Sequence, residues 1–272
     1  MILAFDVGNT EIAIGLFEDR ELLDHWRIGT HPERTVDEFG LLVRGLVRES
    51  GYDADEIRAL VIGSVVPAMT AVAVEMGERH IGSRVVVIDA ATSLPIRLDV
   101  EEPRSVGADR ILNTLAAAQL FQCDTVVVDL GTATTFDCIS GDGVFVGGII
   151  APGVRTGAET LVRNTAKLPR VDLLPPPTVI GRRTETSMQS GIFWGAIDTI
   201  DGLVNRIRRE WQRPQALVVA TGGLAPLLAP HCTTVDRVEP FITLFGLDLA
   251  FHAIEDAEMA VRVRAGRGRR RR

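Results

Sequence analysis

The chain has 272 residues, a formal net charge of −7 and a hydrophobic fraction of 46%, whereas aromatic residues make up only 5%. This length suits two domains. Because aromatic residues are few, their cores must be mainly aliphatic, and such a composition favours layers of strands and helices. The acidic charge argues against a broad nucleic-acid-binding face, and the three isolated cysteines form no disulfide framework. No apolar run reaches the roughly 18 residues that a membrane helix needs, and Asp6 interrupts the apolar N-terminus before a signal-peptide core forms. We therefore expect a cytoplasmic protein.

The N-terminal part of the chain predicts three strands joined by hairpins. Residues 2–7 are apolar and run into Gly8 within the pattern D-x-G-x-T. A second apolar run over 12–17, a polar turn and a third strand-like run over 21–28 follow. The pattern then alternates between helix and strand: a helix over 33–50, a strand over 58–66, a helix over 68–81, a strand over 83–89 and a helix over 105–121.

The second half of the chain repeats the opening pattern. Residues 125–135 form an apolar strand that runs into D-x-G-T-x-T at Asp129 and Gly131. Two further strand-like runs flank a glycine-containing turn at 140–143, as in the first half. The remaining elements are a long helix over 186–211, a buried strand over 216–223 that ends in a glycine pair, and a closing helix over 241–261.

The repeat predicts two duplicated α/β domains, over 1–115 and 116–261. Residues 262–272 contain seven arginines and no acidic residue, and glycines interrupt them. We predict that this basic tail is disordered. It is either a solvated terminus or a weak tether for phosphate or nucleic acid.

Each D-x-G loop has the chemistry of a phosphate and metal site. Glycine has no Cβ, so the backbone can turn tightly and phosphate oxygens can approach its N–H groups. The Thr hydroxyl donates to phosphate oxygens, and the Asp at the strand end supplies an oxygen ligand for Mg²⁺. A single loop of this kind is a common surface hairpin, but two copies with matching flanks favour a metal–triphosphate held from two sides.

Several enzyme classes lack their signatures in this chain. Lys167 is the only lysine and no GxxxxGK[ST] surrounds it, which excludes the P-loop nucleotide-binding enzymes. No strand leads into GxGxxG, which argues against a dinucleotide-binding domain, and no GxSxG supports a hydrolase nucleophile. The five histidines do not have the spacing of zinc ligands.

The two loop motifs, D-V-G-N-T at 6–10 and D-L-G-T-A-T-T at 129–135, resemble the phosphate motifs of the acetate and sugar kinase, heat-shock chaperone and actin superfamily. Within it, four further segments resemble type III pantothenate kinase: P-R-S-V-G-A-D-R at 103–110, G-G-I-I-A-P-G at 147–153, the segment 181–191 that begins G-R-R-T, and A-T-G-G at 220–223. The resemblance implies two actin-like, ribonuclease H-like domains with a nucleotide cleft between them. It also implies a homodimer that phosphorylates pantothenate with ATP, the first step of coenzyme A biosynthesis.

The resemblance implies a role for each matching position. ATP would contact the first loop at Asp6, Val7, Gly8, Asn9, Thr10, Glu11, Ile12 and Ala13, and elsewhere at Thr132, Gly222 and Gly223. Asp6 would lie near Mg²⁺, and Asp129 would help bind a monovalent cation, either potassium or ammonium. Pantothenate would contact Val100, Gly107, Ala108, Asp109, Arg110 and Thr184. Many family members have Tyr at the position of Val100, so this chain lacks one expected substrate contact.

Residue chemistry agrees with Asp109 as the acceptor of the hydroxyl proton. Asp109 falls at the start of a predicted helix, where the N-terminal partial charge favours an ionised carboxylate. An ionised carboxylate within reach can take the proton as the bond to phosphorus forms. On residue type alone, Asp109 also fits a helix cap, and the pair Gly222 and Gly223 also fits an ordinary turn between strand and helix.

Two other functions remain open at this point. One is a kinase or phosphatase that acts on another small molecule, which the replacement at Val100 would favour. The other is a non-enzymatic regulatory relative, such as a transcriptional accessory factor, for which the arginine-rich tail is the only local support. The two D-x-G loops and Asp109 favour the pantothenate kinase, because a binding module needs no base.

Overall fold

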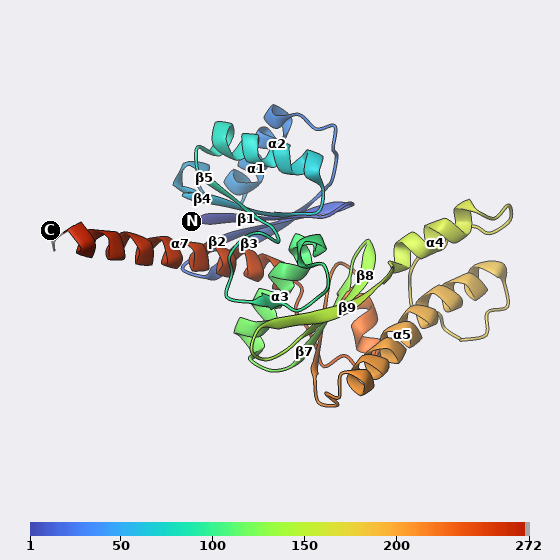
Figure 1. Cartoon of the computed structure of the whole chain (residues 1–272). Helices are drawn as coiled ribbons and strands as arrows, with labels where there is room; N and C mark the ends of the chain where they lie inside the picture. The colour runs from blue at the N-terminus through green and yellow to red at the C-terminus, as the bar shows by residue number, and fades with distance from the viewer. Residues whose placement is uncertain (270–272) are drawn as a thin grey trace. The chain divides into compact units, whose positions relative to one another are not determined.

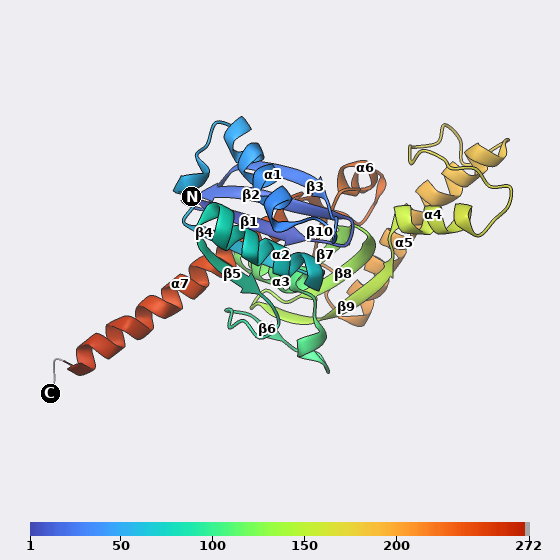
Figure 2. The same ribbon diagram turned by 90° about the horizontal axis from the view of Figure 1, so that it is seen from above.

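The structure is a computed structural model that describes residues 1–269, with side chains described as far as Arg262. Figures 1 and 2 show its helices and strands in two views. The described residues divide into two compact units: residues 1–96, 101–116 and 243–269 form the first, and residues 97–100 and 117–242 form the second. Each unit contains one sheet, as the α/β prediction requires.

The first unit is built on a five-stranded sheet. Its strands are β1 (Ile2–Val7), β2 (Glu11–Glu18), β3 (Glu21–Gly29), β4 (Ala59–Ser64) and β5 (Arg84–Ile88), in the spatial order β3-β2-β1-β4-β5. Strand β1 pairs antiparallel with β2 and parallel with β4. The hairpin between β2 and β3 closes through Asp19 and Arg20, whose positive φ angles of 49° and 69° match the twist of the two strands.

Helices pack against this sheet through its apolar core. They are α1 (Val36–Glu49), α2 (Pro67–Met76) and the π-helical turn η2 (Gly77–Ile81), with the short turns η1 (Ala54–Glu56) and η3 (Pro103–Ser105) in the connections. A reciprocal capping box between Thr35 and Glu38 starts α1. Phe39 of α1 meets Phe5 of β1 edge to face, with ring centroids 5.8 Å apart. Both side chains are fully buried, which stabilises the fold by about 1.5–3 kcal/mol for each.

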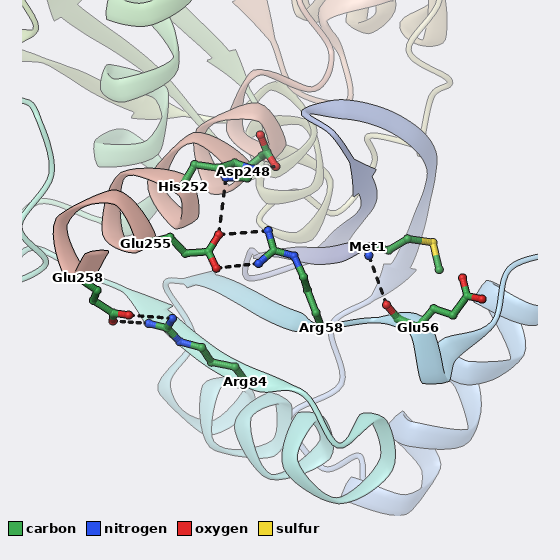
Figure 3. Close-up of polar contacts among 8 residues, drawn as sticks. All are labelled: Met1, Glu56, Arg58, Arg84, Asp248, His252, Glu255 and Glu258. Carbon is green, nitrogen blue, oxygen red and sulfur yellow. Dashed lines mark hydrogen bonds and ion pairs between the residues drawn. The ribbon is translucent and has the colours of Figure 1, made fainter. Parts of the chain in front are cut away.

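Two helices from later in the chain complete the first unit: α3 (Ala108–Phe121) through residue 116, and α7 (Ile242–Arg269) from residue 243. Figure 3 shows that Glu255 and Glu258 of α7 each form a two-pronged ion pair, with Arg58 and Arg84 respectively. Both guanidinium groups also lie over the ring of Phe251, at 5.0 and 5.8 Å. Helix α7 is therefore anchored to the parallel half of the first sheet.

The second unit repeats the topology of the first. Its strands are β6 (Arg97–Leu98), β7 (Thr125–Leu130), β8 (Ala133–Ile139), β9 (Val144–Pro152), β10 (Leu217–Thr221) and β11 (Arg237–Val238), in the spatial order β11-β10-β7-β8-β9-β6. Strand β7 pairs antiparallel with β8 and parallel with β10, as β1 does with β2 and β4. The second strand of each unit also has a register shift near its end, after Leu16 and after Cys138. The predicted duplication is confirmed, and β6 is an added edge strand.

The helices of the second unit are α4 (Val154–Arg163), α5 (Thr184–Glu210) and α6 (Ala225–Leu228), with the turn η4 (Ala229–His231). Helix α5 runs for 27 residues without a break, although Gly191 and Gly195 lie within it. Its buried stripe includes Phe193, Ile197 and Val204, which pack in the same core as the apolar residues of β7 and β10. Among the described residues, no helix is both long enough and apolar enough to span a bilayer.

Two predicted boundaries differ from the structure. The segment from 243 groups with the first unit and not with the second, because Leu244 and Leu247 pack against Gly15 and Gly63 of the first sheet. Where a disordered tail is predicted from residue 262, α7 continues to Arg269. Arginine is a good helix former, and extending a helix that already exists costs little. Residues 270–272 of the predicted tail lie outside the described residues.

Candidate active site

The first D-x-G loop is held by hydrogen bonds at its base. The Gly8 N–H donates to the Glu11 carbonyl at 3.0 Å, and a Cβ on Gly8 would lie 3.0 Å from the same oxygen. At the end of β3, the Thr30 hydroxyl donates to the Gly8 carbonyl at 2.7 Å and the Thr30 N–H donates to the Thr10 carbonyl at 2.9 Å. Asn9 and Thr10 are exposed. The loop therefore has a fixed base and a polar tip, as phosphate binding requires.

The second D-x-G loop is held in a similar way. The Gly131 N–H donates to the Ala133 carbonyl at 3.1 Å. The Thr156 hydroxyl of α4 donates to the Thr132 carbonyl at 2.8 Å, while Thr132 itself is exposed. Gly153, just before α4, lies so close to this loop that a Cβ would overlap the carbonyl groups of both loop residues. The start of α4 thus fixes the loop.

Gly222 lies directly against Asp129 at the ends of the parallel strands β10 and β7. Its φ is +86°, and a Cβ on it would overlap Asp129 Oδ1 and lie 2.7 Å from the Leu130 nitrogen. The Leu224 N–H donates to the Leu130 carbonyl at 3.2 Å, which ties the turn after β10 to β7. The strand ends therefore bring Asp129, Gly131 and Gly222 together, in the position where open α/β sheets commonly bind ligands.

The first unit brings the G-A-D-R segment next to the end of β1. Asp6 is half-buried and pairs in register with Gly63 of β4. Immediately after β4, the Val65 N–H donates to the Val7 carbonyl at 3.1 Å. A Cβ on Gly107 would lie 3.4 Å from Val65 Cγ1. Val65 thus links two segments that the sequence predicts to bind ATP and pantothenate.

The Asp109 carboxylate folds back over the start of α3. The helix begins with a hydrogen bond from the Ile111 N–H to the Gly107 carbonyl at 3.2 Å. Asp109 Oδ1 accepts from the Arg110 N–H at 2.8 Å and lies 2.5 Å from where a Cβ on Gly107 would stand. Burial raises the pKa of Asp109, although the Arg110 N–H and guanidinium oppose that rise. Burial therefore outweighs the lowering of the Asp109 pKa that we expected from the helix N-terminus. The carboxylate is a stronger base than that of an ordinary aspartate.

The two remaining predicted substrate contacts, Val100 and Thr184, lie in the second unit. Val100 is half-buried and lies two residues after the end of the edge strand β6. Between them, the Asp99 N–H donates to the Phe145 carbonyl of β9 at 2.9 Å. Thr184 is the exposed first residue of α5 and lines an open pocket of about 810 Å³, together with Arg183 and Ser187. This volume is in the range of small-molecule sites, which typically measure about 300–1,000 Å³.

The residues at the two strand ends have the oxygen donors that a phosphate-bound cation needs. No group of three or more His, Cys, Asp or Glu side chains converges on one point within the described part of the chain. Mg²⁺ in kinases needs no such cage, because one or two carboxylates and the substrate phosphates complete its coordination. Asp6, which precedes a glycine loop in the first unit, fits this requirement, and Asp129 in the second unit offers the same type of oxygen ligand to a separate cation. The missing Cβ of Gly222 leaves room for the second carboxylate.

Comparison with known proteins identifies the family. The family model for type III pantothenate kinase matches residues 2–206. A type III pantothenate kinase from Moorella thermoacetica is 46% identical over 253 residues, which cover 92% of this chain and 98% of that protein. The enzymes of the same name from Myxococcus xanthus and Geobacter sulfurreducens are 45% and 42% identical over the same shares of the two chains. The chain belongs to the type III pantothenate kinase family.

Solved structures with low sequence identity share the fold of this family member. A Campylobacter jejuni protein assigned to the Baf family of transcriptional activators has a TM-score of 0.59 at 16% identity and covers 94% of this chain and 100% of its own. A Sinorhizobium meliloti protein assigned as a 2-dehydro-3-deoxygalactonokinase has a TM-score of 0.54 at 15% identity, with coverage of 93% and 97%. At these identities the likeness concerns the fold alone. Together with the matching sheets, it confirms the two-domain, ribonuclease H-like architecture.

Sequence reasoning missed the residues that support the loops of this kinase family member. Thr30 and Thr156 fix the two D-x-G loops through their hydroxyls, and Val65 joins β1 to Gly107. Gly153 lies in the segment 147–153 that resembles the family, but its contact with the second loop is visible only in the structure. Thr30 and Val65 carry no local signal.

Proposed function

We propose that this chain transfers the γ-phosphoryl group of ATP to the primary hydroxyl of pantothenate, which yields 4′-phosphopantothenate and begins coenzyme A biosynthesis. The observation that carries the proposal is the start of α3, where Asp109 with its raised pKa lies against Gly107, and Gly107 in turn lies against Val65, which is hydrogen-bonded to the end of β1. Family membership supports the same activity. A kinase needs both a phosphate-binding loop and a proton acceptor, and the first unit has a candidate for each in its D-x-G loop and Asp109.

We assign ATP binding to the two loops and the glycine turn after β10. We assign the segment from Asp6 to Ala13 to the phosphates, with its exposed tip at Asn9 and Thr10. Thr132 offers a second hydroxyl from an exposed position. Gly222 and its neighbour Gly223 present backbone without side chains, which suits close contact with the adenosine.

Cations complete this assignment. In our proposal Asp6 lies near Mg²⁺ and Asp129 helps bind potassium or ammonium. When bound with ATP, Mg²⁺ would neutralise negative charge that develops on the transferred phosphoryl group. The role of the protein is to hold the carboxylates at fixed strand ends, which hydrogen bonds around both glycine loops achieve.

The phosphoryl transfer requires one proton acceptor. The pantothenate hydroxyl oxygen forms a bond to the γ-phosphorus while the bond from that phosphorus to the β–γ bridging oxygen breaks, and ADP leaves. The hydroxyl proton passes to the Asp109 carboxylate. The neighbouring Gly107, Ala108 and Arg110 would contact the substrate, and the Arg110 guanidinium suits its carboxylate or amide group.

From the family resemblance we also assign Val100 and Thr184 to pantothenate binding. Because a valine cannot replace a tyrosine hydroxyl, we expect weaker pantothenate binding than in family members with Tyr at this position. The same residue favours an alternative, a kinase of this fold that acts on another small alcohol. A homodimer and a cytoplasmic location remain predictions from the family resemblance and the composition.

Turnover of the purified protein tests the proposal. The assay measures ADP release with ATP, Mg²⁺ and pantothenate, in parallel series with potassium, ammonium and sodium. Wild-type protein should turn over, and Asp109→Asn should lose roughly 10²–10⁴-fold in kcat while it still binds ATP. Asp198→Asn, an exposed change on α5, is the matched control and should behave like wild type. A wild-type protein that binds ATP but releases no ADP with pantothenate in any of these salts would rule out this substrate.

A further inference from the structure

One turn after Asp109, helix α3 carries a buried amide that bonds to a distant helix. Asn113 is 1% exposed, and its Oδ1 accepts a hydrogen bond from the Thr243 hydroxyl at 2.8 Å. Thr243 is 7% exposed and lies in the first turn of α7. A buried hydrogen bond of this kind fixes relative position, because breaking it leaves a polar atom without water. Both residues belong to the first unit.

Leu112, which precedes Asn113 in α3, packs against two glycines of the same unit. A Cβ on Gly63 of β4 would overlap the Leu112 side chain, and a Cβ on Gly246 of α7 would overlap the Leu112 carbonyl. Gly63 pairs in register with Asp6. The Leu112 side chain therefore packs directly on the backbone of β4, and the backbone of α3 at Leu112 lies directly against Gly246 of α7, so α3 has little room to shift toward either element.

Helix α7 is itself a fixed support for this contact. Beyond Gly246, its Glu255 and Glu258 bind Arg58 and Arg84 (Figure 3). The ring of Phe251 lies beneath both guanidinium groups. The helix is thus fastened to the sheet several turns after Thr243. The position of its first turn is determined by the first sheet, so that the bond to Asn113 ties α3 to that sheet as well.

We propose that the hydrogen bond between Thr243 and Asn113 positions the Asp109 carboxylate for proton transfer, with Thr243 acting as a positioning residue. Asp109 and Asn113 are four residues apart and share one face of α3, separated by roughly 6 Å along the axis. A displacement of a catalytic group by about 1 Å can lower a rate by roughly 10²-fold. This inference rests on the proposed function, because it takes Asp109 as the acceptor of the hydroxyl proton.

The test compares two substitutions at one position, one that removes the hydroxyl and one that keeps it. Thr243→Val keeps the shape but removes the hydroxyl, whereas Thr243→Ser keeps the hydroxyl. We expect kcat for pantothenate phosphorylation to fall roughly 10-fold or more in the valine variant, with KM for ATP within about 2-fold of wild type. The serine variant should stay within about 3-fold of wild type in kcat. Hydrogen exchange of the peptide 108–116 should accelerate in the valine variant alone.

A matched control separates positioning from general loss of stability. Thr234 of the second unit is also buried, and its hydroxyl donates to Asp201 at 2.6 Å. Thr234→Val should lower the melting temperature without lowering the kcat of the folded fraction. Equal kcat losses in Thr234→Val and Thr243→Val, or unchanged exchange of 108–116 in Thr243→Val, would overturn the inference. A wild-type protein without turnover would defeat the proposed function, and the exchange measurement would still decide whether Thr243 positions α3.

Discussion

Gly222 and Asp129 occupy adjacent strand ends so closely that a Cβ on the glycine would overlap a carboxylate oxygen of the aspartate. The glycine also has a φ of +86°, which side chains rarely adopt. We therefore expect Gly222→Ala to displace Asp129 and to abolish turnover, and to cost at least about 1–3 kcal/mol of folding stability. Chemical denaturation and ADP release measure the two effects.

Gly51 supplies the control for this substitution. Its φ is +87°, but a Cβ built there has no heavy atom within 4 Å apart from those of Gly51 itself and its two chain neighbours. Gly51→Ala should therefore show the cost of backbone conformation alone and should keep full turnover. If the two variants lose the same stability and both remain active, the close contact with Asp129 has no functional consequence.

The raised pKa of Asp109 determines the direction of two pH effects. Proton transfer needs the ionised carboxylate, so kcat should fall as pH drops through the raised pKa, at a higher pH than an ordinary aspartate would give. The folded chain binds this proton more tightly than the unfolded chain, so stability is lost as pH rises through the folded-state pKa. Asp109→Asn should therefore raise the melting temperature at neutral pH while it removes activity.

Thermal melts of wild type and Asp109→Asn across a pH series test whether loss of the Asp109 carboxylate raises the melting temperature. The gain in melting temperature should shrink as the buffer becomes acidic, because the wild-type carboxyl is then protonated as well. A variant that melts below wild type at neutral pH would show that the Asp109 carboxylate stabilises the fold, contrary to the burial argument.

Asp201 of α5 should show the opposite pH dependence. Burial raises its pKa, but hydrogen bonds from the N–H and hydroxyl groups of Thr234 and Thr233 outweigh burial, so the pKa lies below its usual value. Its contribution to stability is present above the unfolded-state pKa and is lost as pH falls through the folded-state pKa. Asp201→Asn should cost about 1.5–3 kcal/mol at neutral pH, because it removes a charged acceptor. Asp198→Asn, exposed on the same helix, should cost nearly nothing, and equal losses in the two would contradict this.

The ion pairs that anchor α7 should contribute little individually. Arg58 and Glu255 are partly exposed, with side-chain exposures of 49% and 30%, and their closest atoms are 2.7 Å apart. A double-mutant cycle with Arg58→Met and Glu255→Gln should give a coupling of about 0.2–1 kcal/mol that decreases with added salt. Hydrogen bonding to Arg58 lowers the pKa of Glu255, which agrees with a favourable pair. A coupling that does not respond to salt would indicate a pair shielded from solvent.

The sequence predicted the architecture because the duplicated D-x-G hairpins are local features. Asp6 and Gly8, like Asp129 and Gly131, are followed by strands whose apolar pattern identifies them directly. The membership of α7 in the first unit was not predictable, because an apolar helix face does not reveal which sheet covers it. The bond from Thr243 to Asn113 spans 130 residues and has no local signal.

The chemistry of the candidate site was predictable only in part. Residue type and motif indicated Asp109, but its burial comes from tertiary packing, which reversed the predicted effect of the helix N-terminus on its pKa. The glycine pair after β10 was ambiguous in the sequence. The positive φ of Gly222 and its contact with Asp129 now explain why a glycine is needed at the first position of the pair.

Product identification tests the central claim most directly. Wild-type protein is incubated with ATP, Mg²⁺, potassium and pantothenate, and the products are separated and identified by mass spectrometry and phosphorus NMR. We expect ADP and pantothenate phosphorylated on its primary hydroxyl, in equal amounts, and formation of both at least roughly 10²-fold slower with Asp109→Asn. Unmodified pantothenate beside protein that still binds ATP would contradict the account and leave another small alcohol as the acceptor to be sought.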